Sequence, residues 1–166
     1  SAPQAVGVEG DTIVRFASAP PRNATIIDGA GQFLCPGLID AHVHFFLPGN
    51  ASPVRTYLAS SAEEKLAIAE TNASIALQSG ITTMRDCGAP APLMIQLRNR
   101  LKSELAIGPH VLSCGAPLTR PRGHLHFFGE EVGDEAAVRA AIDRQLRNGN
   151  EFVKLIASGG GLTPHT

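Results

Sequence analysis

Cysteine is scarce in this sequence of 166 residues. Only Cys35, Cys87 and Cys114 are present, they lie far apart, and no C-x-x-C pair occurs. The odd number and the wide spacing argue against a disulfide scaffold and against a cysteine zinc knuckle. We expect the three thiols to behave as small buried hydrophobic groups.

An excess of charge and long apolar runs are missing as well. The formal net charge is −1, which offers no electrostatic attraction for nucleic acid or for an anionic membrane. No apolar run approaches the roughly 20 residues that span a bilayer, and the N-terminus has neither the basic start nor the apolar core of a signal peptide. We expect no nucleic-acid partner, no membrane contact and a cytoplasmic location. The first residues already resemble part of a folded domain.

The residues that are present suit a soluble globular protein, because 43% are hydrophobic and 17% are charged. Residues 12–16 and 24–28 are two short β-type runs. From His42 onward, strands alternate with helices. Strands are predicted for the run ending at His44 and over 81–85, 110–114 and 152–157, and helices over 61–78, 92–105 and 134–149. This order implies parallel strands with right-handed crossovers, either an open doubly wound sheet or part of a (β/α)8 barrel, and periodicity does not choose between them.

The most informative stretch runs from Cys35 to Phe45 and reads C-P-G-L-I-D-A-H-V-H-F. Residues two apart on a strand share a face, so His42 and His44 point one way and Val43 the other. Two neutral imidazoles on a rigid strand end form a bidentate seat for a metal such as Zn²⁺. The alternative is a pair of partly exposed histidines at a strand end.

The residues before the histidines favour the metal site. Pro36-Gly37 is a turn signal, and Leu38-Ile39 reads as a short buried strand. Asp40 shares the face of His42 and could orient a ligand or a neighbouring loop.

Other candidate residues follow the later strands. Lys154 interrupts an apolar strand, where it either extends its amine to solvent or stays neutral and nucleophilic near a metal. Arg85 and Asp86 close the second strand and could orient the histidines, contact substrate or pair with each other. The loop after the third strand carries a second H-x-H and two arginines that suit a substrate carboxylate. Its candidate residues are Arg120, Arg122, His124 and His126.

Three blocks of the sequence resemble the metal-dependent amidohydrolase superfamily, and they fall in the order of that family. They are P-G-L-I-D-A-H-V-H from Pro36 to His44, G-I-T-T-M-R-D from Gly80 to Asp86, and F-V-K-L-I-A-S-G-G from Phe152 to Gly160. The L-T-x-x-x-G-H-x-H-F-x-G-E and S-G-G-G loops look most like the dipeptidase and imidazolonepropionase-like branches. The resemblance implies an α/β fold, a (β/α)8 TIM-type barrel. Because such a barrel needs roughly 250 residues, the chain looks truncated: residues 1–34 are expected to be part of a small β-sandwich, and 35–166 to supply the first four barrel strands.

The resemblance also implies a metal site. His42, His44 and Lys154 match metal ligands of the family, with Lys154 converted by CO₂ to a carbamate that bridges two ions. One or two divalent ions, zinc first, are expected. No residue of this chain fills the catalytic position, because the general-base aspartate and two further histidines are expected beyond residue 166.

The expected activity is hydrolysis of an amide C–N bond in a dipeptide, an N-acyl amino acid or a cyclic amide, by metal-activated water. Two alternatives stay open: an inactive fragment or subunit of a split barrel that needs a partner chain, and a phosphotriesterase-like hydrolase on the same scaffold. The expected partners are a small-molecule amide or peptide substrate and the remainder of the barrel, from the same or a second chain. A homo-oligomer is compatible with the sequence.

Overall fold

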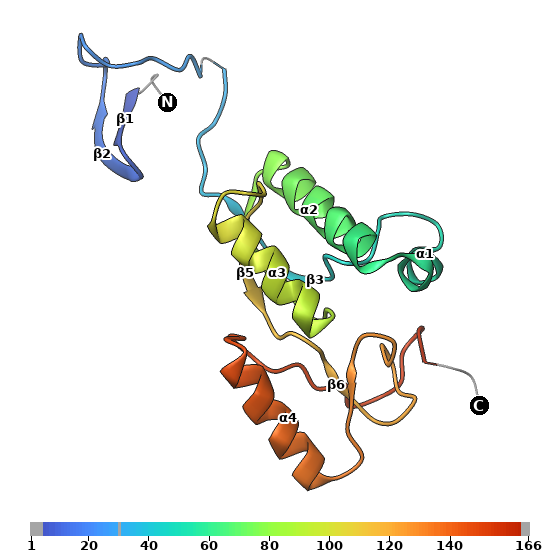
Figure 1. The fold of residues 1–166 in the computed structure, drawn as a ribbon. Helices are drawn as coiled ribbons and strands as arrows, with labels where there is room; N and C mark the ends of the chain where they lie inside the picture. Colours follow the sequence, from blue (N-terminus) through green and yellow to red (C-terminus); the bar gives the residue numbers. More distant parts are fainter. Residues whose placement is uncertain (1–4, 30, 164–166) are drawn as a thin grey trace. The chain divides into compact units, whose positions relative to one another are not determined.

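The computed structural model describes residues 5–29 and 31–163. The chain divides into two compact units, Ser1–Pro36 and Gly37–Thr166, drawn in Figure 1. The division falls two residues beyond the boundary expected after residue 34. That the first unit belongs to a β-sandwich stays a prediction.

The first unit contains one antiparallel hairpin. Its strands are β1 (Ala5–Glu9) and β2 (Thr12–Ala17). Gly10 lies in the connecting turn with a φ of +61°, a backbone conformation that glycine adopts without strain. The strand expected over residues 24–28 is wrong: these residues pair with no strand. Ile27 is 92% exposed, because no neighbouring backbone or apolar layer covers this run.

The second unit is built on a parallel sheet with the order β3-β4-β5. The strands are β3 (Leu38–Val43), β4 (Ile81–Asp86) and β5 (His110–Ser113). Helices α2 (Ala62–Gln78) and α3 (Ala91–Lys102) connect them, lie side by side and cover the sheet (Figure 1). The predicted alternation of parallel strands and helices is confirmed over this part of the chain.

The ends of α2 follow from local sequence chemistry. The Ser61 side chain accepts the backbone N–H of Glu64, and the Glu64 carboxylate accepts the backbone N–H of Ser61, which is a capping box. Gly80 follows the helix with a φ of +87°, as expected of a glycine that ends a helix. Ala69 and Ala73 are fully buried, so small side chains bring α2 close to the sheet.

A short helix, α1 (Pro53–Ala59), precedes α2 and was not predicted from the sequence. Its single buried side chain, Tyr57, packs against the rings of Phe127 and Phe128, with centroid distances of 5.5 and 5.6 Å. Seven residues with one buried position carry no helical periodicity. A contact distant in sequence therefore holds α1 in place.

The last helix, α4 (Glu135–Arg147), begins as predicted, because the Asp134 carboxylate accepts the N–H of Ala137. Apolar spacing predicts an inward face of Val138, Ala141, Ile142 and Leu146, and the structure differs from it in part. Gln145 is buried, whereas Leu146 is 57% exposed. The Gln145 amide donates to the carbonyl of Ala116 at 3.0 Å, a polar contact that apolar periodicity does not reveal.

The strand expected over residues 152–157 is wrong as a regular strand. Only Leu155 makes a bridge, and it pairs with Leu118. Leu118 belongs to β6 (Leu118–Thr119), a short strand that pairs with β7 (Glu130–Glu131) and that the sequence did not indicate. The ladder is interrupted because the chain turns at Gly115, at a φ of +64°, after β5 has ended.

Three expectations about the approach to β3 are also wrong. Pro36-Gly37 forms no turn; the chain is extended there, and a Cβ on Gly37 would overlap the side chain of Thr82. Leu38 and Ile39 are 58% and 72% exposed, because β3 is an edge strand and nothing in the described part of the chain covers their side. Cys35 is exposed on this extended segment, whereas Cys87 and Cys114 are buried as expected. Within residues 5–29 and 31–163, no helix is long and apolar enough to cross a membrane.

Candidate functional site

The two histidines of the first H-x-H lie together where β3 ends. Their ring centroids are 5.6 Å apart, with the planes inclined at 66°. Asp40 accepts the backbone N–H of His42 at 3.1 Å, so its carboxylate fixes the main chain at His42 and forms no bond to the imidazole. Both rings therefore stand at the carboxyl end of the parallel sheet, the edge at which α/β proteins bind ligands.

His44 is held in one orientation by a backbone carbonyl. Its Nδ1 lies 2.9 Å from the oxygen of Gly88. A carbonyl oxygen only accepts hydrogen bonds, so Nδ1 carries the proton and Nε2 keeps its lone pair. Burial lowers the pKa of His44, and the charges of His42, Lys154 and His124 act in the same direction, against the bond to Gly88. A neutral imidazole with a free Nε2 is the form that binds a metal.

Gly88 is required at this place by the close approach of other groups. Its φ is +153°, and an added Cβ would lie 3.0 Å from Pro117 and 3.1 Å from the Phe128 ring. The same phenyl ring lies 5.8 Å from the His44 ring. A side chain at position 88 would therefore displace the carbonyl that orients His44, and it would also displace the Phe128 ring that packs beside His44.

Asp86 connects the chain after β3 to the chain after β4 by hydrogen bonds. Its carboxylate is fully buried and accepts the N–H groups of Phe45 and Gly88, both at 2.9 Å. Burial raises the pKa of Asp86 to about 7, against the two hydrogen bonds, which favour the charged form. Of the alternatives for Asp86, the structure supports a role in placing the histidine-bearing segment.

Arg85 points in a different direction from Asp86, and no ion pair between these two described residues is formed. Its guanidinium donates to the carbonyl of Ala41 at 3.2 Å and lies 3.8 Å above the ring of Phe152. Arg85 therefore connects the end of β3 with the segment that carries Lys154.

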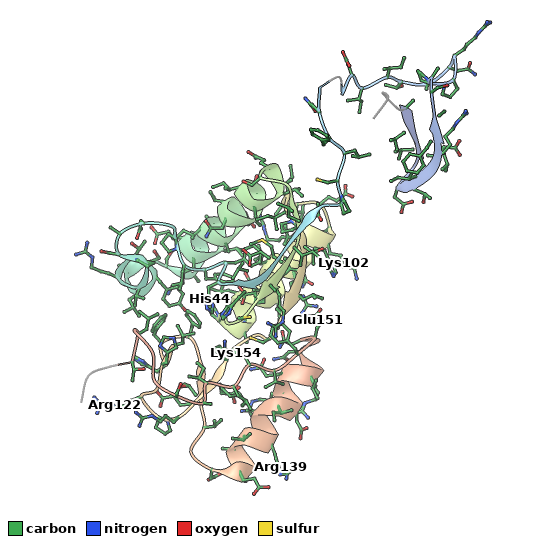
Figure 2. All side chains as sticks on the ribbon, turned by 180° about the vertical axis from the view of Figure 1, so that it is seen from behind. His44, Lys102, Arg122, Arg139, Glu151 and Lys154 are labelled. Atoms are coloured by element: carbon green, nitrogen blue, oxygen red, sulfur yellow. The ribbon has the colours of Figure 1, made fainter. Side chains whose placement is uncertain are left out.

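Lys154 lies on that segment, close enough to His44 for its charge to act on the imidazole. It is half-buried, and its charge lowers the pKa values of His44 and His124. Figure 2 labels His44 and Lys154 in the same region of the second unit. Among the described residues, the amine of Lys154 has no hydrogen-bond or ion-pair partner, so it is available to a ligand.

These residues fit part of a metal site. Two imidazoles and an unpaired amine suit a borderline ion, and one imidazole is already oriented by its second nitrogen. In the described part of the chain, no group of three or more His, Cys, Asp or Glu side chains is placed to hold an ion. The candidate ligands among the described residues are the two histidines and the lysine.

The loop after β5 forms a small cavity of about 50 Å³. The Oγ1 of Thr119 is fully buried and, among the described residues, has no hydrogen-bond partner. His124 lines the cavity; its Nδ1 accepts the N–H of Leu162 at 3.3 Å, and burial lowers its pKa. The lining residues are Thr119, Arg120, Gly123, His124, Ile156, Ala157, Ser158 and Gly159.

The structure separates the four loop candidates. Arg120 and His124 line this cavity, whereas Arg122 and His126 do not. Arg122 is exposed and its backbone N–H donates to Glu131. His126 lies over Phe127, with Nδ1 3.1 Å from the carbonyl of Gly123.

Comparison with known proteins decides the family. The sequence model of the amidohydrolase family matches residues 33–166. The chain belongs to the amidohydrolase family. Members of this family are hydrolytic enzymes with a TIM-barrel fold, and the chain forms an α/β part of such a fold.

Among curated relatives of this amidohydrolase chain, an uncharacterised protein of Mycobacterium tuberculosis strain H37Rv is 32% identical over 143 residues, covering 86% of this chain and 34% of the relative. Ochratoxinase of Aspergillus niger is 30% identical over 157 residues, covering 76% and 31%. A crystal structure of a prolidase complexed with N-methylphosphonate-L-proline matches with a TM-score of 0.78 and 26% identity, covering 97% of this chain and 43% of that one. The chain spans about a third of the length of the two curated relatives.

Proposed function

We propose that the protein is a metal-dependent hydrolase that cleaves an amide C–N bond, with His42, His44 and Lys154 as the metal ligands that this chain supplies. One observation carries the proposal: the bond from His44 Nδ1 to Gly88 O leaves Nε2 free beside the ring of His42. An imidazole fixed through one nitrogen is the usual arrangement of a histidine that binds a metal through the other.

The names of related proteins support the substrate class. A prolidase, an ochratoxinase and a dihydroorotase are among them. They support an amide, peptide or cyclic amide substrate for this chain.

The residues of the chain would share the work as follows. His42 and His44 would hold one divalent ion, for which zinc suits the imidazole ligands. Addition of CO₂ to the Lys154 nitrogen would form an N–C bond, release protons from the amine and give a carbamate, a carboxylate-like group that could serve as a further ligand for the ions. A bound ion polarises a carbonyl and lowers the pKa of its water to about 7. Asp86 and Gly88 keep His44 in place throughout.

The remaining parts of the centre belong to the rest of the barrel. We propose that β3, β4 and β5 are its first three strands, and that residues 152–157, which make a single bridge here, lie at the position of the fourth. Two further histidines and the general-base aspartate would then come from residues beyond 166, in the same chain or in a second one.

The cavity at the loop after β5 suits one end of the substrate. Arg120 lines it and carries a charge that complements a carboxylate. A dipeptide or N-acyl amino acid offers that group.

A substrate comparison tests the proposal in the full-length protein. Dipeptides and N-acyl amino acids should be hydrolysed, the activity should disappear with a chelator, and zinc should restore it. Aryl phosphotriesters serve as the control class. Hydrolysis of the esters without any amide turnover, or amide turnover that survives complete metal removal, would contradict the proposal.

A further inference from the structure

Glu151 lies three residues before Lys154 and joins that segment to β5 twice. Its backbone N–H donates to the carbonyl of Ser113 at 3.0 Å. Its carboxylate Oε2 accepts the backbone N–H of Ser113 at 2.8 Å. One residue thus satisfies both backbone groups at the end of β5, and its side chain replaces the carbonyl that a regular strand would supply.

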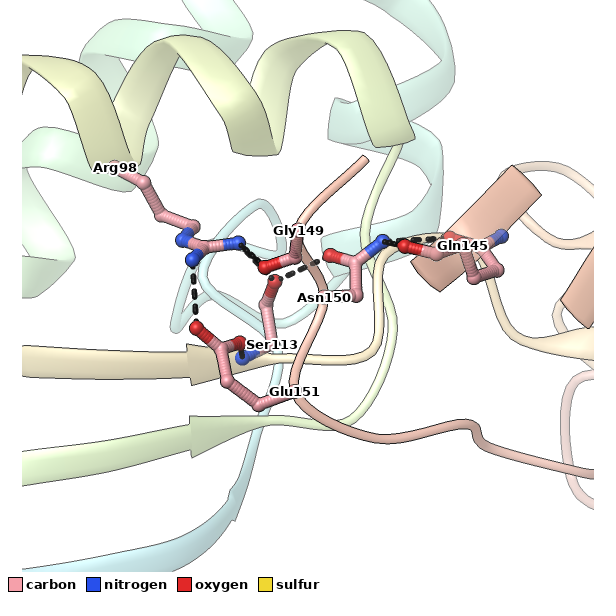
Figure 3. A network of polar contacts seen from close by, with 6 residues as sticks. All are labelled: Arg98, Ser113, Gln145, Gly149, Asn150 and Glu151. Atoms are coloured by element: carbon pink, nitrogen blue, oxygen red, sulfur yellow. Dashed lines mark hydrogen bonds and ion pairs between the residues drawn. The ribbon is translucent and has the colours of Figure 1, made fainter. Parts of the chain in front are cut away.

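Arg98, on α3, fixes the direction of this carboxylate (Figure 3). Its guanidinium donates to Glu151 Oε1 at 2.6 Å and to the carbonyl of Gly149 at 2.8 Å. Because one carboxylate oxygen is occupied by Arg98, the other is directed at Ser113. A helix, a strand end and the segment leading to Lys154 therefore meet at one ion pair.

Asn150 forms a second attachment beside the first. Its Oδ1 accepts the hydroxyl of Ser113 at 2.7 Å, and its Nδ2 donates to the side-chain oxygen of Gln145 at 2.8 Å (Figure 3). Asn150 and Gln145 are both buried. The turn between α4 and residue 151 is thus tied to β5 by buried polar contacts, which are costly to break.

After residue 151, few hydrogen bonds hold the segment that carries Lys154 to its neighbours. The Lys154 carbonyl accepts the N–H of Leu118, and the Leu118 carbonyl accepts the N–H of Ile156, both at 2.9 Å. No continuous ladder forms among the described residues of this segment. The position of Lys154 is therefore set by the contacts with Ser113 of β5 and with Leu118 of β6.

We propose that Glu151, oriented by Arg98, is a positioning residue for Lys154. It sets the register of residues 151–156 against β5 and β6, and so the position of the lysine amine relative to His42 and His44. A slip of one residue would turn Lys154 to the opposite face of the segment. The inference rests on the proposed function, in which Lys154 is a metal ligand.

A purely structural ion pair would behave differently, and the chain contains a matched example. Arg100, also on α3, pairs with Glu70 on α2. Both pairs are partly exposed and join α3 to a neighbour, but Glu70 lies on a helix far in sequence from Lys154. Loss of Glu70 should change stability without changing the metal centre.

The test uses Glu151→Gln, Glu151→Ala and the control Glu70→Gln in the full-length protein. Glu151→Gln keeps an acceptor for Ser113 and loses only the ion pair, so it answers the question even where Glu151→Ala fails to fold. Zinc affinity is measured by chelator competition, and amide hydrogen exchange is measured at Leu118 and Ile156. We expect both Glu151 variants to bind zinc about 10-fold or more weakly and to exchange faster at these two amides, and Glu70→Gln to match wild type.

The variant Lys154→Ala distinguishes failure of the proposed metal site from failure of the positioning role of Glu151. If Lys154→Ala loses zinc while both Glu151 variants keep wild-type affinity and exchange, the positioning role is wrong and the metal site stands. If Lys154→Ala binds zinc as wild type does, the proposed metal site is wrong, and the positioning role fails with it.

Discussion

His44 Nδ1 and the carbonyl oxygen of Gly88 lie 2.9 Å apart, so a residue that follows β4 orients a side chain that follows β3. The relationship joins neighbouring strand ends of the parallel sheet. It also assigns the proton of the imidazole, and with it the nitrogen that is left for a metal.

Gly88→Ala should weaken metal binding. The new Cβ would meet Pro117 and Phe128, and a φ of +153° disfavours any side chain, so the carbonyl must move away from His44. We expect about 10- to 100-fold lower affinity, as for other losses of a group that orients a ligand. Chelator competition measures it. Gly133→Ala is the control, because nothing lies within 4 Å of its added Cβ; equal affinities in the two variants would refute the role of Gly88.

Asp86→Asn should lower stability. The two oxygens of the Asp86 carboxyl, protonated or not, accept two N–H groups, whereas an amide offers one oxygen and a donor, so one buried N–H of Phe45 or Gly88 loses its partner. A buried donor left unpaired costs about 1–3 kcal/mol of unfolding free energy. Urea denaturation of the metal-free protein at about pH 5 measures the difference, and exposed Asp143→Asn should stay within about 0.5 kcal/mol of wild type. If Asp86→Asn unfolds at the same urea concentration as wild type, the hydrogen bonds of Asp86 do not stabilise the fold as proposed.

The same carboxyl predicts a pH dependence. Burial raises the pKa of Asp86 from 3.8 to about 7, so between these values the folded protein keeps a proton that the unfolded chain releases. The contribution of Asp86 to stability is therefore greatest below about pH 4 and falls as the pH rises to about 7. Wild type should lose more unfolding free energy than Asp86→Asn over this window. Parallel pH profiles for the two proteins would exclude the raised pKa.

The sequence predicts best those structural features that arise from interactions between residues close together in the chain. Ser61 and Glu64 cap α2 through groups three residues apart, and the alternation of His42 and His44 is a property of the strand itself. Groups close in sequence account for both features. The alternating parallel order from β3 to β5 also follows from the pattern of the chain.

The features that sequence reasoning missed depend on distant partners. Gln145 is buried because it bonds Ala116, and Glu151 takes a strand-like role because Ser113 and Arg98 face it. Neither residue has an apolar neighbour pattern that marks it. Gly88 followed a predicted strand, but its carbonyl became informative only when His44 was seen beside it.

Cys87 and Cys114 should resist labelling in the folded protein. Burial raises the pKa of Cys114 to about 12 and also raises that of Cys87. The thiolate is the reactive form, so neither side chain should react with Ellman's reagent at about pH 8 until denaturant is added. Exposed Cys35 should react first, and Cys35→Ser should remove that fast reaction. Modification of the Cys87 or Cys114 peptide under native conditions, read by mass spectrometry, would contradict this.

The metal content of His42→Ala in the full-length protein tests the central claim most directly. Protein purified without chelators and reloaded with zinc should lose bound metal and amide hydrolysis together, because one of two adjacent imidazoles is gone. His110→Ala is the matched control, since His110 is exposed at the first residue of β5, at the opposite end of the sheet. It should keep both properties. Unchanged metal and full activity in His42→Ala would show that the first H-x-H does not hold the catalytic ion.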